Sequence, residues 1–567
     1  MEDTKTPAIS ELVRSLLAKR GVVDDADVVA FLSPDYDAHT HAPELLHDMH
    51  IATDRILRAI GLGERIAIYA DFDCDGIPGA AVLSDFFAKI TYDNVEVYLP
   101  HRDREGYGFH TDAIDALAAR GVKLIITVDV GTVAVDACAY AHAIGVDVII
   151  TDHHEIIGER PTCVALLNPK ISPYPFPGLC GAAMAFKLVQ ATLQEGRNRK
   201  LENFISIPDG WEKWLLDLVA IATVADMVPL VGENRALVHW GLRVLRKSQR
   251  PGITALCTML RLRKNELTED DIGFSIAPRV NAASRMDEPD LALRLLTTRN
   301  IDEAEHLAAQ LESLNASRKG VVAGIVKHAR KHVAARYTAD DTVVVLGDTE
   351  WKPALLGLAA NSIMNDRGGV VCLWGRDANG KLKGSCRSDG SVSLADLFTQ
   401  ARDAFEECGG HAASGGFSVS HESVHTLPDT LTQAVSLIRA GAAAPDTKNA
   451  TEHDALVTLR EISWPLLREV SLLAPFGMNN AKPIFRVSSV MVSSVRTFGK
   501  EKNHVEIQLA DASSGQSIRA FQFFKLADDF THAPKQGDTV HILATLERDT
   551  FRGPATLVLR VIDVLPA

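Results

Sequence analysis

The sequence predicts an α/β protein whose first domain is built on a parallel sheet and whose last domain is a small β-barrel. Short β-rich runs alternate with helix-like stretches between about residues 50 and 230, which is the rhythm of a parallel sheet with helices on both faces. Short strands separated by turns fill residues 455–567. About five strands in a segment of this size are typical of an OB-type barrel.

The chain of 567 residues is too long for one hydrophobic core, and its length suggests about three or four domains. Changes in pattern along the chain predict five parts, with a linker of small and polar residues at 441–453. The parts are an N-terminal helical segment (1–48), a first α/β domain (49–234), a helical connector (235–338), a second α/β domain (339–442) and an OB-like domain (454–567).

The composition, with 46% hydrophobic and 23% charged residues, is that of a soluble globular protein. The first residues are charged and no apolar run approaches the roughly 18 residues of a membrane span. Eight cysteines without a CxxC pair predict reduced thiols in the cytosol. The net charge of −14 argues weakly against general nucleic-acid binding and leaves room for a local basic channel.

The first α/β domain follows the expected alternation closely. The predicted strands are Ile66–Ala70, Val95–Leu99, Leu124–Val128, Val146–Thr151 and Val164–Leu167. The predicted helices between them include Asp112–Arg120 and Val133–Ile144, and a further helix begins near Pro78. In sheets of this kind, sites form at the carboxyl ends of the strands.

Three aspartates follow the first of these strands. Asp71, Asp73 and Asp75 alternate before Gly76, so an extended chain would place their side chains on one side of the backbone. Hard divalent cations take oxygen ligands of this kind. Taken alone, the stretch is equally well explained as a solvated acidic turn.

Two neighbouring strands also end in groups that bind metals. The third strand runs into Asp129, and the fourth runs into Asp152, His153 and His154. The carboxyl ends of parallel strands meet at one edge of a sheet, so these groups predict a two-metal site together with the first aspartates. Asp226, at the end of an apolar helix, is a further candidate, with a simple helix-end turn as the alternative.

The connector is helical and rich in Arg and Lys, which indicates either a solvated face or the wall of a channel that follows phosphates. Within it, Arg279 and Arg285 flank Asn281 in a predicted loop. Arginine forks bind phosphate oxygens in a bidentate way.

Two glycine-containing segments of the second α/β domain are predicted to be loops. They are Gly384–Ser388 and Gly409–Phe417. Their backbone could approach an anion closely, and plain turns are the alternative.

The barrel carries basic and aromatic residues together. Its predicted strands are Ile484–Val495, His504–Leu509, Ser517–Phe523, Thr539–Leu546 and Ala555–Val564. Arg519, Phe521, Phe523, Phe524 and Lys525 lie close together in the sequence, a mixture that suits stacking on the bases of single strands. Phenylalanines of a barrel core are the alternative.

Six motifs now stand in a fixed order. They are DxDxDG at 71–76, VDxG at 128–131, DHH at 152–154, the lone Asp226, RxNAAxR at 279–285 and GGH at 409–411. This order resembles the DHH phosphoesterase superfamily. With the barrel and the overall length, it is most similar to the superfamily's single-strand-specific 5′ exonucleases, from about residue 50 to residue 567.

The resemblance implies a fold and a set of metal ligands. The fold is an α/β one, with a parallel-sheet DHH domain, a helical connector, a DHH-associated α/β domain and an OB-like β-barrel. Two divalent cations, Mn²⁺ or Mg²⁺, would be held by Asp71, Asp73, Asp75, Asp129, His153 and Asp226. Asp129 would bridge the ions, while Asp71 either ligates or supports the site.

The resemblance also implies the residues that act on the substrate. His154, which would face the scissile phosphate, Asp129 and Asp152 form the expected catalytic group. The DNA contacts would come from Arg102, Tyr107, Arg279, Asn281, Arg285, Ser385, Arg387, Gly409, Gly410 and His411.

The function implied is 5′→3′ hydrolysis of single-stranded DNA to mononucleotides by two-metal-ion catalysis, in DNA repair and recombination. A helicase and a single-strand-binding protein are expected partners, in the cytoplasm and without a membrane. One alternative is a phosphodiesterase of short oligonucleotides or cyclic dinucleotides, whose members usually lack the barrel. Another is a non-catalytic scaffold that binds single strands, whose members have lost ligands, whereas every ligand position is filled here. Unrelated DxD phosphotransfer chemistry would not explain the later motifs.

Overall fold

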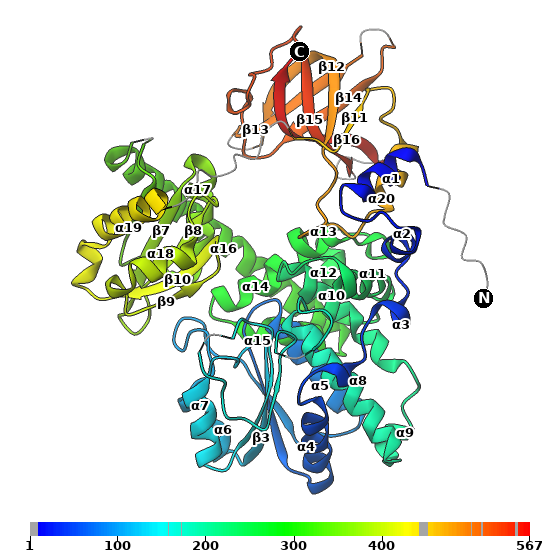
Figure 1. Ribbon diagram of the computed structural model, residues 1–567, viewed down its shortest axis with the longest axis vertical. Coiled ribbons are helices and arrows are strands. Elements are labelled where there is room, and N and C mark those ends of the chain that lie inside the picture. The colour runs from blue at the N-terminus through cyan, green and yellow to red at the C-terminus, as the bar shows by residue number, and fades with distance from the viewer. Residues whose placement is uncertain are drawn as a thin grey trace. The chain divides into compact units, whose positions relative to one another are not determined.

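The computed structural model describes residues 9–156, 158–171, 173–338, 340–441, 452–499, 502–511, 514–549 and 554–567 (Figure 1). Its internal contacts divide the chain into two compact units. The first combines Met1–Thr40, Pro229–His239 and Thr447–Ala567, and the second combines His41–Val228 and Trp240–Asp446. Most of the linker predicted at 441–453 lies outside the described residues.

A five-stranded parallel sheet forms the base of the second unit. The strands are β1 (Arg65–Ala70), β2 (Val95–Tyr98), β3 (Val122–Val128), β4 (Asp147–Thr151) and β5 (Ala165–Leu167). Their order is β2-β1-β3-β4-β5, and every neighbouring pair is parallel. β1 and β3–β5 are almost entirely apolar, as expected when helices cover both faces of a sheet. The predicted parallel sheet is confirmed.

Helices pack on both faces of this sheet. On one face, α6 (Thr111–Ala119) and α7 (Val135–Ala143) share a core with Ala67, Tyr69 and Ile125. On the other, α5 (Gly76–Lys89) packs against α8 (Gly181–Asn198) and β1. Gly79 makes this packing possible, because a Cβ there would overlap the side chain of Val128. α4 (Met49–Leu62), α9 (Glu202–Ile205) and α10 (Leu216–Ala225) complete the domain.

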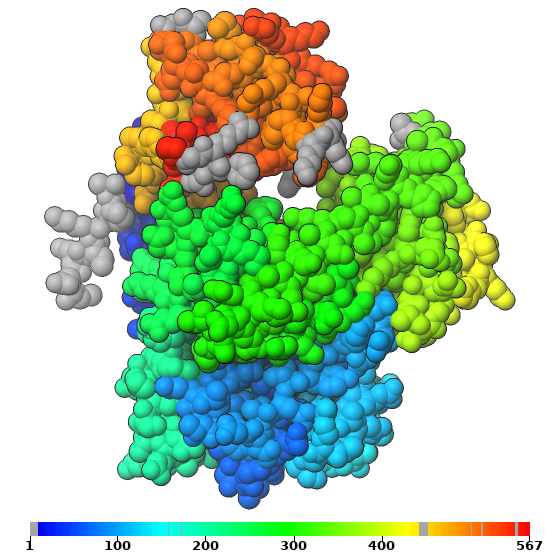
Figure 2. Space-filling model, turned by 180° about the vertical axis from the view of Figure 1, so that it is seen from behind, coloured from blue at the N-terminus to red at the C-terminus, as the bar shows by residue number. Residues whose placement is uncertain are grey.

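A series of helices follows the sheet domain and forms the green surface in Figure 2. They are α11 (Gly232–Lys247), α12 (Pro251–Met259), α13 (Glu269–Asp271), the π-helical turn η4 (Ile272–Ile276), α14 (Ala277–Arg285), α15 (Pro289–Thr297) and α16 (Ile301–Arg336). The prediction of a loop around Asn281 is therefore wrong, because this segment is the helix α14. Pro278 stands directly after the π-helical turn η4, where its missing N–H cannot continue the regular hydrogen bonding of the helix.

A buried network of ion pairs joins α5 and α10 to the connector. Arg250 donates from Nη1 to Asp85 Oδ2 (2.6 Å) and from Nε to Asp217 Oδ2 (2.8 Å). Arg299 donates to the other oxygen of Asp85 (2.6 Å), and the Ser248 hydroxyl donates to Asp217 (2.8 Å). Because both carboxylates are buried, each depends on these partners for its charge to be tolerated.

The second unit also contains a smaller mixed sheet. Its elements are β6 (Val343–Gly347), α17 (Pro353–Arg367), β7 (Val370–Arg376), β8 (Leu382–Ser388), α18 (Leu394–Gln400), β9 (Glu407–Gly410), β10 (Ser414–Val419) and α19 (Leu427–Gly441). The order is β6-β7-β8-β10-β9, with only β6 and β7 parallel. The two predicted glycine loops are mainly strands, because Gly384 leaves room for the ring of Phe417 between neighbouring strands.

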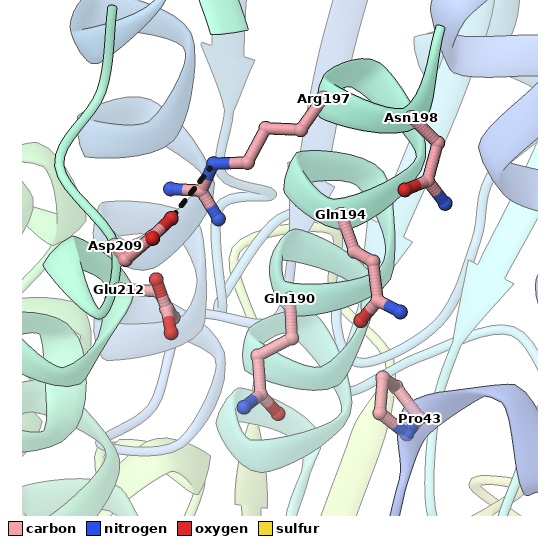
Figure 3. A pocket seen from close by; sticks show the side chains of 7 residues that line it. All are labelled: Pro43, Gln190, Gln194, Arg197, Asn198, Asp209 and Glu212. Atoms are coloured by element: carbon pink, nitrogen blue, oxygen red, sulfur yellow. Dashed lines mark ion pairs between the residues drawn. The ribbon is translucent and has the colours of Figure 1, made fainter. Parts of the chain in front are cut away.

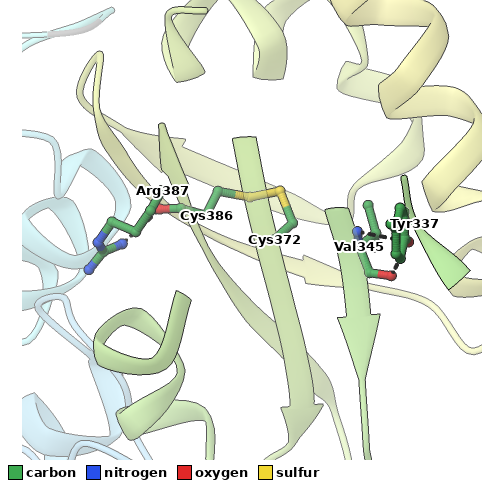
Figure 4. Close-up of a disulfide and its surroundings, with 5 residues drawn as sticks. All are labelled: Tyr337, Val345, Cys372, Cys386 and Arg387. Atoms are coloured by element: carbon green, nitrogen blue, oxygen red, sulfur yellow. Dashed lines mark hydrogen bonds between the residues drawn. A yellow bond between two sulfur atoms is a disulfide. The ribbon is translucent and has the colours of Figure 1, made fainter. Parts of the chain in front are cut away.

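Two cysteines face each other across β7 and β8. Cys372 is the direct partner of Cys386 in the antiparallel pair, and their Cα atoms are 4.2 Å apart. They form a disulfide, with Arg387 next along the chain (Figure 4). The prediction of eight reduced thiols is therefore wrong for this pair, since strand register brings together residues that are far apart in the sequence. The other six cysteines are free.

The first unit contains a closed barrel. Its strands are β11 (Ala455–Val457), β12 (Phe485–Phe498), β13 (His504–Ala510), β14 (Ser517–Gln522), β15 (Thr539–Asp549) and β16 (Thr556–Pro566). β12 pairs with both β13 and β15, and the parallel pair β14–β16 completes the closure. The predicted OB-like barrel is confirmed.

Short helices share this unit. They are α1 (Glu11–Ala18), α2 (Asp25–Leu32), α3 (Tyr36–His39) and α20 (Trp464–Ser471). Val13, Leu16 and Leu17 of α1 form a core with Val28 and Leu473. Among the described residues, no helix combines the length and the apolar character needed to cross a bilayer.

Substitution of Asp217 by alanine tests the buried network. We expect a loss of about 3–5 kcal/mol in the free energy of unfolding, because Arg250 would be left buried beside one carboxylate instead of two. Urea unfolding measures this. Asp209→Ala removes a carboxylate that is 98% exposed and paired only with Arg197, so it should change stability by no more than about 0.5 kcal/mol. Equal small losses in both variants would contradict the role of the network.

Candidate metal centre

The strand order places a crevice between β1 and β3. From these two adjacent strands the sheet continues in opposite directions, to β2 on one side and to β4 on the other. Ligands bind at such a switch point, outside the carboxyl ends of the strands. Asp71 follows β1, Asp129 follows β3 and Asp152 follows β4, so all three stand at this edge of the sheet.

The stretch after β1 is a tight turn. Asp73 Oδ1 accepts hydrogen bonds from the backbone N–H of Asp75 (2.8 Å) and of Gly76 (3.2 Å), where α5 begins. The predicted extended alternation of the three aspartates is therefore wrong. Gly76 is required, because a Cβ there would overlap the carbonyl of Asp71. The carboxylates converge because the chain turns around them.

Asp75 is held by the start of another helix. Its two oxygens accept the backbone N–H groups of Gly181 (2.6 Å) and Ala182 (2.7 Å), in the first turn of α8. A helix N-terminus stabilises a carboxylate in this position. The side chain is buried and fixed before any ligand binds.

Asp129 occupies a strained backbone position beside α8. Its φ is +61°, which is uncommon outside glycine and costs on the order of 1–3 kcal/mol. A Cβ on Gly181 would overlap the Asp129 side chain. The surrounding structure therefore forces this carboxylate into one place.

His153 lies at the centre of the carboxylates. Its Nε2 is 3.2 Å from Asp129 Oδ1, 3.6 Å from Asp75 Oδ2 and 3.6 Å from Asp226 Oδ2. Asp226 follows the last residue of α10, so the helix end delivers it to the site.

The ligand atoms fall into three sets that could each hold a cation. Within each set the atoms lie within 4.8 Å of one another. The sets are Asp75 with His153 and Asp226, Asp71 with Asp73 and Asp129, and Asp129 with His153 and His154. Asp129 and His153 each belong to two of the sets. Of the two, only Asp129 has two ligand oxygens, so it is the residue that could bridge two cations.

Several of these atoms have no hydrogen-bond partner within the protein. Asp71 Oδ1, Asp129 Oδ1 and His153 Nε2 are buried and unsatisfied. Such groups are expensive unless something pairs with them. Carboxylate oxygens and an imidazole nitrogen are ligands of Mn²⁺ and Mg²⁺. The residues present therefore fit two divalent cations.

Burial and mutual repulsion raise the pKa of the aspartates. The pKa of Asp75 rises to about 6 and that of Asp226 to about 9, in both cases through burial first and neighbouring carboxylates second. The same two causes raise the pKa of Asp71 and Asp129 well above the ordinary value. Burial and the neighbouring His154 lower the pKa of His153 to about 3, so its imidazole is neutral and can donate a lone pair.

Asp152 holds His154 and lies outside the three sets. It accepts hydrogen bonds from the backbone N–H of Thr132 (2.8 Å) and of His153 (2.7 Å), and its Oδ1 is 2.7 Å from His154 Nδ1. Burial favours the neutral acid, but these partners outweigh it and lower the pKa of Asp152. Burial likewise opposes the charge on His154, and Asp152 outweighs it and raises the pKa of His154. Tyr107 Oη is 3.2 Å from the same Nδ1.

Four arginines lie near one another, and two of them, Arg102 and Arg285, interact with the charge of Asp73. Arg285 of α14 is buried and donates to the carbonyl of Ala354 (2.5 Å). Burial lowers its pKa first, and the nearby charges of Arg102, Arg318 and Arg387 lower it further, while Asp73 acts in the opposite direction. Three of these arginines were predicted to bind the substrate. Arg318 is one of the basic residues of the connector, which were predicted to form either a solvated face or the wall of a phosphate channel, and no short motif marks it.

Two predicted DNA contacts are engaged within the protein. Asn281 Oδ1 accepts the backbone N–H of Cys74 (3.0 Å), so it fastens α14 to the aspartate turn. Arg279 donates to Glu312 (2.7 Å) and to the carbonyl of Ser275 (3.1 Å). These contacts indicate that both residues also have a structural role in the segment around the site.

The remaining predicted contacts come from the smaller sheet. Ser385 lies on β8 beside Arg387, and Gly409 and Gly410 end β9. His411 follows in the turn to β10, where its N–H donates to Ser414 (2.8 Å), and its charge contributes to lowering the pKa of His153.

A separate pocket of about 320 Å³ lies elsewhere in the second unit (Figure 3). It is lined by Pro43, Gln190, Gln194, Arg197, Asn198, Asp209 and Glu212. None of these residues belongs to the predicted site, so the pocket volume does not locate the metal centre.

Comparison with known families assigns three regions of the chain. Residues 65–223 match the N-terminal domain of the DHH family, residues 340–438 match the DHHA1 domain and residues 453–563 match the RecJ OB domain.

The curated relatives are exonucleases named RecJ. The Bacillus subtilis protein is 35% identical over 89% of this chain, and the chain spans 62% of its length. The Escherichia coli protein is 32% identical over 74% of each chain, and the Haemophilus influenzae protein is 28% identical over 92% of each. All three are described as single-stranded-DNA-specific exonucleases.

Solved structures agree. RecJ from Thermus thermophilus in complex with Mn²⁺ matches with a TM-score of 0.77 and 25% identity, over 99% of this chain and 76% of that one. An exonuclease RecJ bound to manganese matches with a TM-score of 0.59 and 28% identity, over 70% and 96%.

The fold and the cluster of carboxylates and imidazoles at its strand ends define a phosphoesterase of the DHH class. Within that class, the chain belongs to the RecJ family. The predicted resemblance and the predicted fold class are confirmed.

Metal binding should depend on pH in a predictable direction. The aspartate pKa values are raised above an unfolded value of about 4. The aspartates, in their protonated form, therefore make their full contribution to the stability of the fold below pH 4. It is lost as pH rises through about 6 for Asp75 and about 9 for Asp226. We expect saturating Mn²⁺ to raise Tm more at pH 8 than at pH 5.5, because it replaces fewer protons at the higher pH.

Thermal melts with Mn²⁺ and with EDTA at both pH values measure this effect. Asp226→Asn removes the group with pKa about 9 and should reduce the difference between the two pH values. Asp209→Asn is the matched control on the surface. An equal Mn²⁺-induced rise in Tm at both pH values would contradict the titration of these aspartates.

Proposed function

We propose that this chain is a metal-dependent exonuclease that hydrolyses single-stranded DNA from the 5′ end to mononucleotides, for DNA repair and recombination. One observation carries the proposal. A buried cluster of unsatisfied carboxylate and imidazole ligands lies within electrostatic reach of Arg102 and Arg285, and two further arginines lie near Arg285. Cations would bind to the carboxylates and imidazoles, and the phosphates of a DNA strand would bind to the arginines.

The metal ligands are proposed in two sets. Asp75, His153 and Asp226 would hold one ion, and Asp71, Asp73 and Asp129 the other, with Asp129 as the bridge. Mn²⁺ and Mg²⁺ are the expected ions, and both are present in solved structures of Thermus RecJ. When bound, two such ions lower the pKa of a water and stabilise the attacking and leaving oxygens of the phosphodiester.

The protein's own groups prepare this reaction. His154, held by Asp152 and close to Tyr107, would face the scissile phosphate as a cationic donor. Asp152 acts as a positioning residue for His154, because its oxygens are occupied by N–H groups of its own loop and by that of Thr132 in the loop after β3. Arg102, Arg285 and Arg387 would bind the phosphate oxygens, and Arg318 joins them as a fourth cation.

Single-strand binding is proposed to extend to the barrel. Phe524 is 79% exposed and Phe523 is 41% exposed, whereas Phe521 is buried. Arg560 lies over the rings of Phe521 and Phe523, at 4.6 and 4.5 Å from their centres. The exposed rings and the arginine offer a surface on which bases can stack.

The alternatives fit less well. A phosphodiesterase of short or cyclic substrates would not need the RecJ OB domain matched at residues 453–563, and a binding scaffold would not need a complete ligand set. The division of the chain into five parts remains a proposal. We also propose a helicase and a single-strand-binding protein as partners, and the cytoplasm as the compartment.

One assay separates these functions. It offers 5′-labelled single-stranded DNA, duplex DNA and short RNA, each with Mn²⁺, Mg²⁺ or EDTA.

Substitution of the bridging ligand should abolish activity without unfolding the protein. Asn tolerates the positive φ of position 129, so Asp129→Asn keeps the backbone. We expect kcat on single-stranded DNA to fall by roughly 10³-fold or more. Asp209→Asn, at a side chain that is 98% exposed, is the control. Substantial nuclease activity in a folded Asp129→Asn variant would refute the proposed ligand.

The barrel surface predicts a separate effect. Phe524→Ala should raise KM on long single strands by about 5- to 100-fold, corresponding to one lost stacking contact of about 1–3 kcal/mol, with kcat little changed. Leu526→Ala, a partly exposed neighbour, should leave KM unchanged. An unchanged KM in the Phe524 variant would count against base stacking at this position.

A further inference from the structure

Two histidines on α16 lie one helical turn apart. His328 and His332 place their Nε2 atoms 2.9 Å from each other, and their ring centres are 4.7 Å apart. His328 is exposed, with 45% of its side chain accessible, and His332 is half-buried. Neither belongs to the motifs or to the carboxylate cluster of the metal centre. The two nitrogens can therefore be reached from solvent.

The separation of the nitrogens suits a chelated ion. Imidazole nitrogens bind transition metals at about 2.0–2.1 Å. Two nitrogens 2.9 Å apart would then enclose an angle of about 90° at the metal. This is the angle between neighbouring ligands in a square-planar or octahedral site. A displacement of a few tenths of an ångström opens it to a tetrahedral angle. Little rearrangement of the side chains is needed.

A carboxylate stands behind the first histidine. Asp348 Oδ2 is 3.6 Å from His328 Nδ1, while Asp348 Oδ1 accepts the N–H of Glu350 (2.9 Å). The backbone N–H of Asp348 donates to the carbonyl of Trp374 (3.2 Å) in β7. A carboxylate at Nδ1 favours the tautomer whose Nε2 presents a lone pair, and such carboxylates support metal-binding histidines in many sites.

We propose that His328 and His332 form a second, distinct metal site, which takes a borderline transition metal such as Zn²⁺, Ni²⁺ or Cu²⁺. Two imidazoles select these ions over Mg²⁺ and Mn²⁺, which prefer oxygen ligands and stand low in the affinity order. Asp348 supports the site from the turn between β6 and α17. This inference is independent of the proposed nuclease function.

The structure supplies a reporter for this site. Trp351 is buried, and its ring centre is 5.6 Å from that of His328, with the rings nearly perpendicular. Cu²⁺ quenches the fluorescence of a nearby indole. Binding at the histidine pair should therefore quench Trp351, and Trp351→Phe should remove that component of the signal.

The test titrates CuCl₂ into the full chain after Mg²⁺ has been added in excess to occupy the carboxylate centre. We expect saturable quenching in the unmodified protein and at least a tenfold higher midpoint in His332→Ala, because one imidazole alone forms no chelate. His332 does not contact Trp351, so its loss leaves the reporter in place. His306→Ala removes a lone exposed histidine of the same helix and should leave the midpoint unchanged.

Competition completes the experiment. Added Zn²⁺ should protect Trp351 from quenching by Cu²⁺ in the unmodified protein. Quenching with the same midpoint in His332→Ala would overturn the proposal. So would an absence of saturable, Trp351-dependent quenching in the unmodified protein. Circular dichroism of each variant establishes that α16 remains folded.

Discussion

Repulsion among buried carboxylates is the constraint on which the rest of this structure depends. Asp71, Asp75 and Asp129 are buried at one edge of the parallel sheet, and one oxygen each of Asp71 and Asp129 has no hydrogen-bond partner among the described residues. Without cations, part of the carboxyl groups stay protonated, because ionising all of them would destabilise the folded protein. The fold tolerates this because backbone N–H groups of α8 hold Asp75 and the packing of Gly181 holds Asp129. Binding of divalent cations relieves the strain that the fold maintains.

The nearby arginines supply positive charge that complements the negative charge of the carboxylates. Arg285 reaches the site from α14, Arg387 from β8 and Arg102 from the loop after β2, so three separate parts of the second unit must be in place together. Asn281 ties α14 directly to the aspartate turn. In the proposed function, phosphate binding and metal binding would therefore be linked, because the helix that carries Arg285 also contacts the turn that carries Asp73.

The sequence predicted the parallel sheet and the barrel. It also predicted that Asp71, Asp129 and Asp152 stand at one edge of the sheet, because the carboxyl ends of parallel strands meet there. It failed where long-range contacts decide local structure. The aspartate stretch is a turn because Asp73 caps α5, the segment around Asn281 is a helix because it packs behind that turn, and Cys372 meets Cys386 only through strand register. Arg318 was missed as a site residue because helical residues far along the chain carry no local sign of what they will face.

The central claim is that the cluster holds two cations, with Asp129 between them. Counting bound Mn²⁺ by electron paramagnetic resonance, on metal-free protein at pH 8, tests it most directly. The account predicts two Mn²⁺ ions per chain whose signals are broadened by coupling to each other, and a single uncoupled ion after Asp226→Asn. One ion per chain in the unmodified protein, or two ions without magnetic coupling, would contradict a bridged two-metal centre.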